Sequence, residues 1–246
     1  MRAAGMDLSA ITPDALQAQR ARLRSVSQMP AMPMFNNIAL RREAGQSAEH
    51  FTDFMVDTRR ALHTIDSRPV GHAMLSNLNT APNPSMRDFR TRVTISDSRF
   101  TNAGMNPAAG NHARSEGFLH TREGLPVDST PGMGEASRVY FNPTINHSDG
   151  FRPAFVGLAH ELVHAERNQL GVSVDRQGGN GLRVVRDELE TVGLLAHPQP
   201  TTENAIRAEH GIPLRTAYSG QTRATYMQAI RDALARRQGD GNGGTA

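Results

Sequence analysis

The chain has 246 residues, of which 37% are hydrophobic and 5% aromatic, so it can form one sizeable domain with flanking tails but hardly two. It contains no Cys, which excludes disulfides, thiolate zinc sites and cysteine nucleophiles, and it has no apolar run of the length that spans a membrane. The 27 basic residues are all Arg and the acidic residues number 24; this net charge of +3, with dispersed arginines, does not indicate a nucleic-acid-binding protein.

The first half of the chain is predicted to contain few regular elements. Residues 1–47 are dominated by Met, Pro, Ser and Ala, and their apolar residues follow no sustained period, so we expect a poorly ordered segment. Beyond it, Phe54 and Leu62 fall near one face of a helix. A short β-rich run follows at 92–95, and the Gly-, Pro-, Asn- and Ser-rich segment 101–137 is typical of long loops.

The second half is predicted to contain one strand followed by four helices. Residues 138–142 alternate in polarity and end before a Pro, which indicates a strand. The helical segments, bounded by Pro, Thr or Gly, are 153–170, 182–194, 203–210 and 221–237. Residues 238–246 are Gly-rich and indicate a disordered tail. We therefore expect an α+β domain over residues 48–237 with a helix-rich C-terminal half.

The segment that carries chemistry lies inside the first of these helices and reads His160-Glu161-Leu162-Val163-His164. Residues four apart share a helical face, so His160 and His164 can present two imidazoles to one metal ion. Glu161 lies about 100° away around the helix and can reach a water on that metal. This combination suits Zn²⁺, whose catalytic sites keep one position open for water. We predict His160 and His164 as zinc ligands and Glu161 as general base.

A catalytic zinc site needs a third protein ligand, and the next predicted helix offers three acids. Glu188 shares its helical face with apolar residues, where a carboxylate is costly unless it is paired or bound to a metal. Glu190 instead lines up with arginines on a face that we expect to be solvated. We therefore favour Glu188, and Asp187, Glu190 and His197 are the alternatives.

A second candidate pair is Arg215 and Tyr218. Peptide hydrolysis at a metal needs a donor that stabilises the oxyanion formed when water attacks the carbonyl, and both side chains can supply one. The same Arg-x-x-Tyr spacing is also compatible with a surface Arg and a core Tyr.

Three segments, at 160–165, 186–194 and 202–218, resemble the zinc-protease effectors of bacterial type III secretion represented by NleD and XopG. The Arg-x-x-Tyr pair is also similar to one in clostridial neurotoxin light chains, where it lies beside the scissile carbonyl. The resemblance covers residues 138–220 and implies the same catalytic role for the pair in this chain.

The resemblance implies a zincin fold of the gluzincin type: a small twisted sheet, a strand near residues 139–141 at its edge, and the motif helix beneath. Substrate backbone would add to that edge strand, and the loop 142–152 would border the cleft. It further implies injection into a host cell and cleavage of host proteins there, stress-activated MAP kinases for NleD and immune components for XopG-like members. Residues 1–47 would then act as a type III secretion signal, recognised by the secretion machinery or a chaperone. We expect a monomer.

Two alternatives come from other functional classes. The chain could be an effector that acts by binding a host protein, with a structural or inactive zinc site, although such a site requires neither Glu161 nor the Arg-Tyr pair. It could also be an arginine-rich nucleic-acid-binding protein, although only three Tyr are available for stacking on bases.

Overall fold

The computed structural model of the protein describes residues 35, 37–80, 93–101, 104–115, 136–145, 152–172 and 181–241. These residues form, in chain order, β1 (Ile38–Arg41), α2 (Ala48–Asp66), α3 (Pro69–Asn79), β2 (Val93–Asp97), β3 (Phe100–Thr101), β4 (Gly104–Met105), β5 (His112–Ser115), β6 (Ser137–Phe141), α4 (Ala154–Leu170), α5 (Gly181–Val192), α6 (Glu203–Glu209) and α7 (Arg223–Gly241). None of the described helices is long and apolar enough to span a membrane. The predicted α+β class is confirmed.

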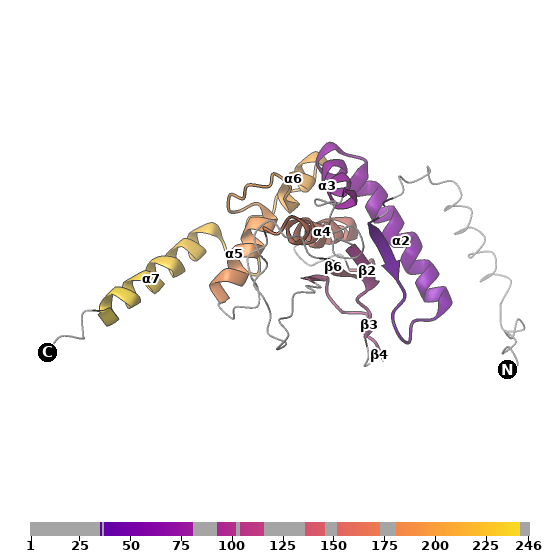
Figure 1. Ribbon diagram of the computed structural model, residues 1–246, viewed down its shortest axis with the longest axis horizontal. Coiled ribbons are helices and arrows are strands. Elements are labelled where there is room, and N and C mark those ends of the chain that lie inside the picture. Colours follow the sequence, from indigo (N-terminus) through magenta and orange to yellow (C-terminus); the bar gives the residue numbers. More distant parts are fainter. Residues whose placement is uncertain are drawn as a thin grey trace, which may run out of the picture. The chain divides into compact units, whose positions relative to one another are not determined.

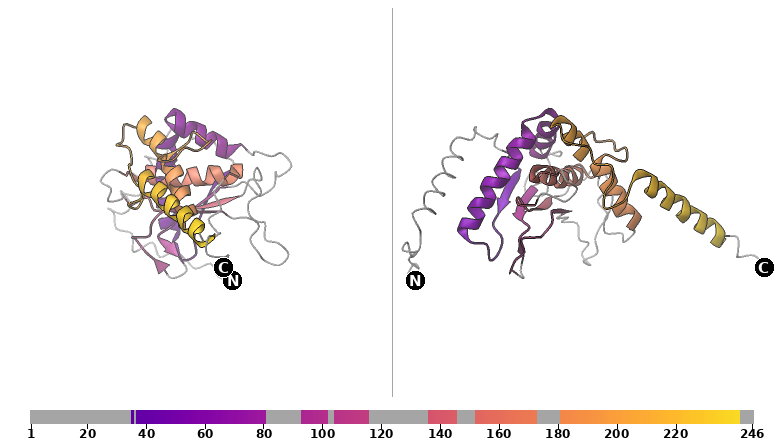
Figure 2. Two further views of the ribbon diagram at one scale, coloured as in Figure 1. Left: turned by 90° about the vertical axis from the view of Figure 1, so that its left-hand side faces the viewer. Right: turned by 180° about the vertical axis from the view of Figure 1, so that it is seen from behind.

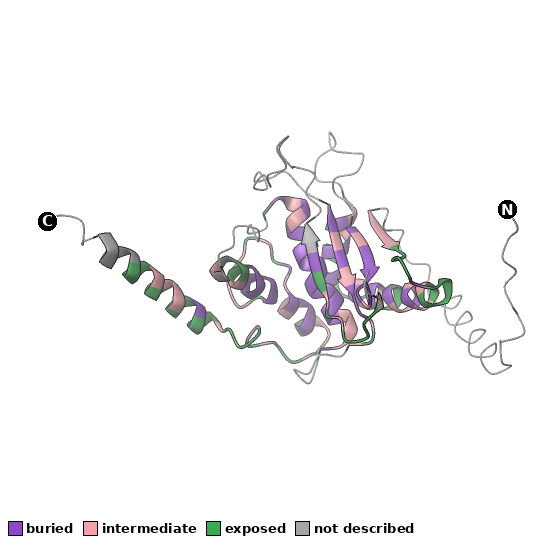
Figure 3. Cartoon of the chain, turned by 90° about the horizontal axis from the view of Figure 1, so that it is seen from below, coloured by how far each residue is buried: buried purple, intermediate pink, exposed green. Residues whose placement is uncertain are grey.

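Four strands form one mixed sheet in the order β1-β2-β6-β5 (Figure 1). β1 and β6 both run parallel to β2, and β5 runs antiparallel to β6. Along β6 the buried side chains of Ser137, Val139 and Phe141 alternate with half-buried ones, because successive residues of a strand point to opposite faces (Figure 3). One face of the sheet therefore packs into the core. β3 and β4 pair separately.

The strand predicted at 138–142 is present as β6, but its predicted position at the edge of the sheet is wrong. β6 lies between β2 and β5, and β5 is the outer strand of the described sheet. The segment 101–137, which we interpreted as loops, contains β4 and β5 as well as the end of β3. These strands have two to four residues with the sequences FT, GM and HARS, which lack the alternation on which a strand prediction depends.

Helix α4 lies at the centre of the helical layer. It contacts β5 and β6 on one side, α2 and α3 on another, and α5 and α6 on a third (Figures 1 and 2). Every residue from Val156 to Arg167 is buried. A helix enclosed in this way has no solvent-facing side, so the polar residues of its His-Glu-x-x-His motif must find their partners inside the protein.

The four helices predicted in the second half are confirmed as α4 to α7, with small shifts at their ends. Gly171 ends α4 in the left-handed conformation, with φ of 65°, which glycine adopts without steric cost. Thr202 begins α6 as an N-cap whose hydroxyl accepts a hydrogen bond from the backbone N–H of Ala205. Helix α7 continues to Gly241, so a disordered tail from residue 238 is wrong for its first four residues.

The N-terminal half holds more structure than its sequence pattern indicates. β1 begins at Ile38 inside the segment expected to be poorly ordered, so that expectation is wrong for 38–41; residues 1–34 and 242–246 lie outside the described residues. Helix α3 was not predicted, although its Met74 and Leu75 are completely buried. The assignment of residues 1–47 as a secretion signal stays a prediction.

Candidate metal centre

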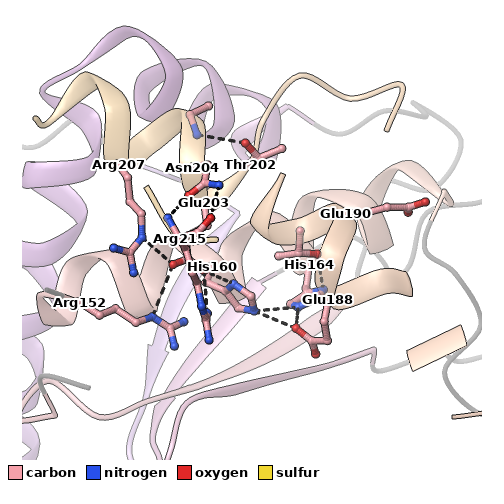
Figure 4. A network of polar contacts seen from close by, with 12 residues as sticks. Arg152, His160, His164, Glu188, Glu190, Thr202, Glu203, Asn204, Arg207 and Arg215 are labelled. Atoms are coloured by element: carbon pink, nitrogen blue, oxygen red, sulfur yellow. Dashed lines mark hydrogen bonds and ion pairs between the residues drawn. The ribbon is translucent and has the colours of Figure 1, made fainter. Parts of the chain in front are cut away.

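Two adjacent helices bring three potential metal ligands together. His160 and His164 come from α4 and Glu188 from α5, and their ligand atoms all lie within 4.8 Å of one another. The Oε2 atom of Glu188 is 3.0 Å from Nε2 of His160 and 3.2 Å from Nε2 of His164, and the two Nε2 atoms are 3.3 Å apart (Figure 4). All three side chains are buried.

The spacing of these atoms fits a tetrahedral metal ion. Bonds of about 2.0–2.2 Å from Zn²⁺ to nitrogen and oxygen place two ligand atoms about 3.3 Å apart. The three observed separations are 3.0, 3.2 and 3.3 Å. Two imidazoles and one carboxylate also match the donors of catalytic zinc sites, which leave a further position for water or substrate. The residues present therefore fit a zinc ion.

The ring of His160 is oriented by a second carboxylate. Its Nδ1 atom is 2.7 Å from Oε2 of Glu203, which is completely buried at the start of α6. A proton donated from Nδ1 to Glu203 leaves the Nε2 lone pair directed at the metal position. Burial disfavours the charged ring of His160, but hydrogen bonds with Glu188 and Glu203 outweigh it and raise its pKa to about 9. In the same way, burial alone would raise the pKa of Glu188, but the two imidazoles hold it well below its usual range.

The ring of His164 is oriented by α5. Its Nδ1 atom lies 3.2 Å from Oδ2 of Asp187 and 3.2 Å from Oγ1 of Thr191. The buried side chain of Arg167, one turn further along α4, donates to Thr191 Oγ1 at 2.8 Å and to the backbone carbonyl of Glu190 at 3.0 Å. Arg167 thus ties the helix of the two histidines to the helix of Glu188.

The structure brings Glu188, rather than its alternatives, to the two imidazoles. Asp187 contacts Nδ1 of His164, whereas Glu188 contacts Nε2, the other nitrogen of that ring. Glu190 accepts a hydrogen bond from Arg186 at 2.7 Å, and the expectation that it is solvated is wrong, because it is only 2% exposed. His197 accepts a hydrogen bond on Nδ1 from the backbone of Gln199 and lies 3.9 Å from Glu190.

Glu161 lies next to this cluster. It is buried, and its negative charge contributes to the raised pKa values of both His160 and Tyr218, so its carboxylate is close to both rings. In the part of the chain that the structure describes, no hydrogen bond holds this carboxylate. The Glu161 carboxylate therefore lies beside the cluster and is available to accept a proton.

Tyr218 stacks on the ring of His160, and Arg215 lies over Tyr218. The Tyr218 ring lies parallel to that of His160, with centroids 5.8 Å apart and an interplanar angle of 5°, and the Arg215 guanidinium lies 4.7 Å from the Tyr218 centroid. A tight turn fixes Tyr218, since Ser219 and Gly220 both have positive φ (46° and 77°) between paired Tyr218 and Gln221. Burial, followed by the charges of Glu188 and Glu161, raises the pKa of Tyr218, so its hydroxyl stays protonated at neutral pH.

Sequence reasoning missed the central role of Glu203. Besides His160, its carboxylate contacts Arg207 (Nε to Oε1, 2.8 Å) and Arg215 (Nη1 to Oε2, 3.2 Å), and Arg152 Nε lies 4.0 Å from Oε1 (Figure 4). Burial would raise the pKa of Glu203, but the hydrogen bond and the charge of His160, with the charges of Arg152 and Arg215, lower it. The sequence shows only that Glu203 follows the helix cap and precedes an Arg by one helical turn. Because acids are common at helix starts for capping alone, this pattern does not indicate a role beside His160.

Comparison with known proteins identifies the family. Residues 42–218 match the family model Peptidase_M91, described as an effector protein. Among solved structures, the chain is similar to a Clostridium botulinum neurotoxin serotype F light chain, with 17% identity, a TM-score of 0.40, and coverage of 62% of this chain and 44% of that one. It is also similar to the catalytic domain of Clostridium botulinum neurotoxin serotype F, with 16% identity, a TM-score of 0.40, and coverage of 76% and 63%.

The chain thus covers less than two thirds of either neurotoxin chain. No curated protein matches it. The assignment rests on the family model, which covers well over half of the sequence: the chain belongs to the Peptidase_M91 family of effector proteins.

Proposed function

We propose that this effector is a zinc-dependent endopeptidase of the zincin type, with His160, His164 and Glu188 as zinc ligands. The observation that carries the proposal is the convergence of these three ligand atoms at tetrahedral spacing, beside a buried and unengaged Glu161. Membership of a peptidase family supports it. Glu188 as third ligand makes the site gluzincin-like.

The residues around the cluster divide the work of peptide hydrolysis. A bound zinc ion would polarise the scissile carbonyl and lower the pKa of a water molecule. Glu161 accepts a proton from the attacking water and transfers it to the amine nitrogen as the C–N bond breaks. The protonated Tyr218 hydroxyl donates to the developing oxyanion, and the positive charge of Arg215 beside it favours the same charge.

We further propose that the substrates are host proteins and that a type III secretion system, with its machinery or a chaperone, delivers the chain as a monomer into the host cytoplasm. The effector family supports delivery into a host. The resemblance of residues 186–194 and 202–218 to NleD supports stress-activated MAP kinases as a first substrate class to test.

The general-base role can be tested with Glu161→Gln, which keeps the size of the side chain. We expect zinc stoichiometry equal to that of wild type, measured by metal analysis, and proteolysis reduced at least about a hundredfold. The assay is mass-spectrometric detection of new protein termini in host lysate. Undiminished cleavage by the variant would exclude Glu161 as base. A host phenotype that survives the substitution would favour the binding-effector alternative.

A further inference from the structure

One buried carboxylate, that of Glu203, lies among four basic side chains and makes hydrogen bonds with three of them. Oxygen Oε1 of Glu203 accepts from Arg207, and Oε2 is shared by His160 and Arg215. Arg152 is the remaining cation, and its Nε stays 4.0 Å from Oε1, beyond hydrogen-bonding distance. Arg152 therefore forms an ion pair with Glu203 but no hydrogen bond (Figure 4).

Arg152 is the arginine of this group whose donors are not satisfied. Arg207 also donates to the backbone carbonyl of Pro213, and Arg215 to that of Ala217. Arg152 is 7% exposed, its buried Nε has no hydrogen-bond partner, and none of its N–H groups donates to a described residue. Its ion pair with Glu203 leaves the buried Nε without a hydrogen-bond acceptor, which is costly, so the position favours a further anionic acceptor.

A second unsatisfied donor lies at the same place. Oδ1 of Asn111 accepts from the backbone N–H of Asn142, which orients the amide, and the buried Nδ2 has no partner. A Cβ atom on Gly157 would lie 2.5 Å from Asn111 Nδ2 and 4.0 Å from Arg152 Nε. Both donors therefore lie close to Gly157 in the first turn of α4, where the Asn111 amide occupies the space that a side chain would take.

The helix itself adds to the positive potential there. The N-cap of α4 is Pro153, which supplies no side-chain cap, and the first turn contains no acidic residue. The N-terminal end of a 17-residue helix carries a partial positive charge that favours an anion. Arg152, Asn111 and this helix end together make a candidate anion-binding site.

We propose that this site binds a carboxylate side chain, Asp or Glu, of the protein substrate. The inference rests on the proposed peptidase function. The Glu203 carboxylate lies between the two side chains, with Oε1 4.0 Å from Arg152 Nε and Oε2 2.7 Å from His160 Nδ1. An extended peptide advances about 3.3 Å per residue, so it spans the distance from the candidate metal site to Arg152 in about four residues or fewer. The enzyme is thus specific for substrates with an acidic residue within about four positions of the cleaved bond.

The test uses the full-length, zinc-loaded protein and a peptide library derived from a whole proteome. New termini are identified by mass spectrometry, with Glu161→Gln as background. The most efficiently cleaved acidic sequence is then synthesised with Asp or Glu, and again with Asn or Gln. We expect kcat/KM at least about tenfold higher for the acidic peptide with wild type, about equal values with Arg152→Gln, and a reversed preference with Arg152→Glu.

Two controls separate specificity from structure. Arg231→Gln, at an exposed arginine of α7, should keep the wild-type preference. Asp149→Asn tests whether an acid of the chain itself serves Arg152. The inference is overturned if wild type shows no acidic preference, if Arg152→Gln lowers kcat/KM for both peptides by the same factor, or if Asp149→Asn reproduces the effect of Arg152→Gln.

Failure of the peptidase proposal has a different signature. If wild type produces no termini above the Glu161→Gln background, the proposed function is wrong. The anion site is then tested by binding alone, with the same peptides passed over immobilised, zinc-loaded Glu161→Gln protein. Retention of acidic peptides that Arg152→Gln abolishes supports the site, and equal retention of acidic and neutral peptides refutes it.

Discussion

Glu203 connects the candidate metal ligand His160 to the charges around it. One oxygen orients the His160 ring and contacts Arg215, which lies over Tyr218, while the other accepts from Arg207. A single side chain therefore sets the direction of a ligand lone pair and the position of the pair proposed to stabilise the oxyanion. Its completely buried charge is stable only because these partners surround it.

We predict that Glu203→Gln weakens zinc binding about 10- to 100-fold, the usual effect of removing a carboxylate that orients a ligating histidine. It should also lower the free energy of unfolding by about 3 kcal/mol, because Arg207 and Arg215 lose their shared anion. Chelator competition measures the zinc affinity and denaturant titration the unfolding. Zinc affinity within twofold of wild type would contradict the orienting role.

The ligand residues could be predicted from sequence because their relations are local. His160 and His164 are one helical turn apart, and Glu188 stood out as an acid on an apolar face of a single helix. Glu203 contacts His160 across 43 positions and Asn111 reaches Gly157 across 46, and only the tertiary fold decides such pairs. Glu190 was misjudged for the same reason, since packing against neighbouring elements decides which helical face is solvated.

At the scale of elements, the candidate metal site lies between two helices rather than within one. α4 supplies two ligands and α5 the third, so the site requires the two helices to keep their register. Arg167 makes that connection: its side chain is 1% exposed and donates to the Thr191 hydroxyl and the Glu190 carbonyl, which belong to the turn of α5 that follows Glu188.

We therefore predict that Arg167→Met lowers zinc affinity about tenfold or more, as Thr191 and Asp187 lose the group that holds them against His164. The free energy of unfolding should also fall by about 3 kcal/mol, because buried acceptors lose their donor. Arg167→Lys, which keeps the charge but not the forked geometry, should recover part of both. Reduced stability with unchanged zinc affinity would show that Arg167 is only structural.

The sheet illustrates the limit of sequence patterns at this scale. β6 was recognisable because the apolar Val139 and Phe141 alternate with more polar residues, but its neighbours in the sheet were not. β5, with the sequence HARS, becomes a strand only because β6 offers it an antiparallel partner. Strand order is a property of the tertiary structure, which explains why the edge was assigned to the wrong strand.

For the whole molecule, the candidate metal site couples the stability of the fold to zinc binding and to protonation of His160. Burial opposes protonation of His160, but Glu188 and Glu203 raise its pKa to about 9 from an ordinary value of 6.5 in the protein without metal. Zinc binds only the deprotonated Nε2 atom, so binding at neutral pH must release this proton. The apparent zinc affinity should therefore rise by up to about tenfold per pH unit until pH 9 and level off above it.

The stability of the metal-free and zinc-loaded forms is predicted to depend differently on pH. Because the folded pKa of His160 is raised, its protonation stabilises the metal-free protein fully below pH 6.5, and this contribution disappears as the pH rises to about 9. The zinc-loaded protein has no proton there to lose. Thermal melts from pH 6 to pH 9, with zinc or with a chelator, should show a difference in Tm between the two forms that widens with pH. Calorimetry in buffers of different ionisation enthalpy should show that about one proton is released per zinc bound at pH 7. A constant Tm difference over this range, with no proton release, would mean that His160 is not a zinc ligand.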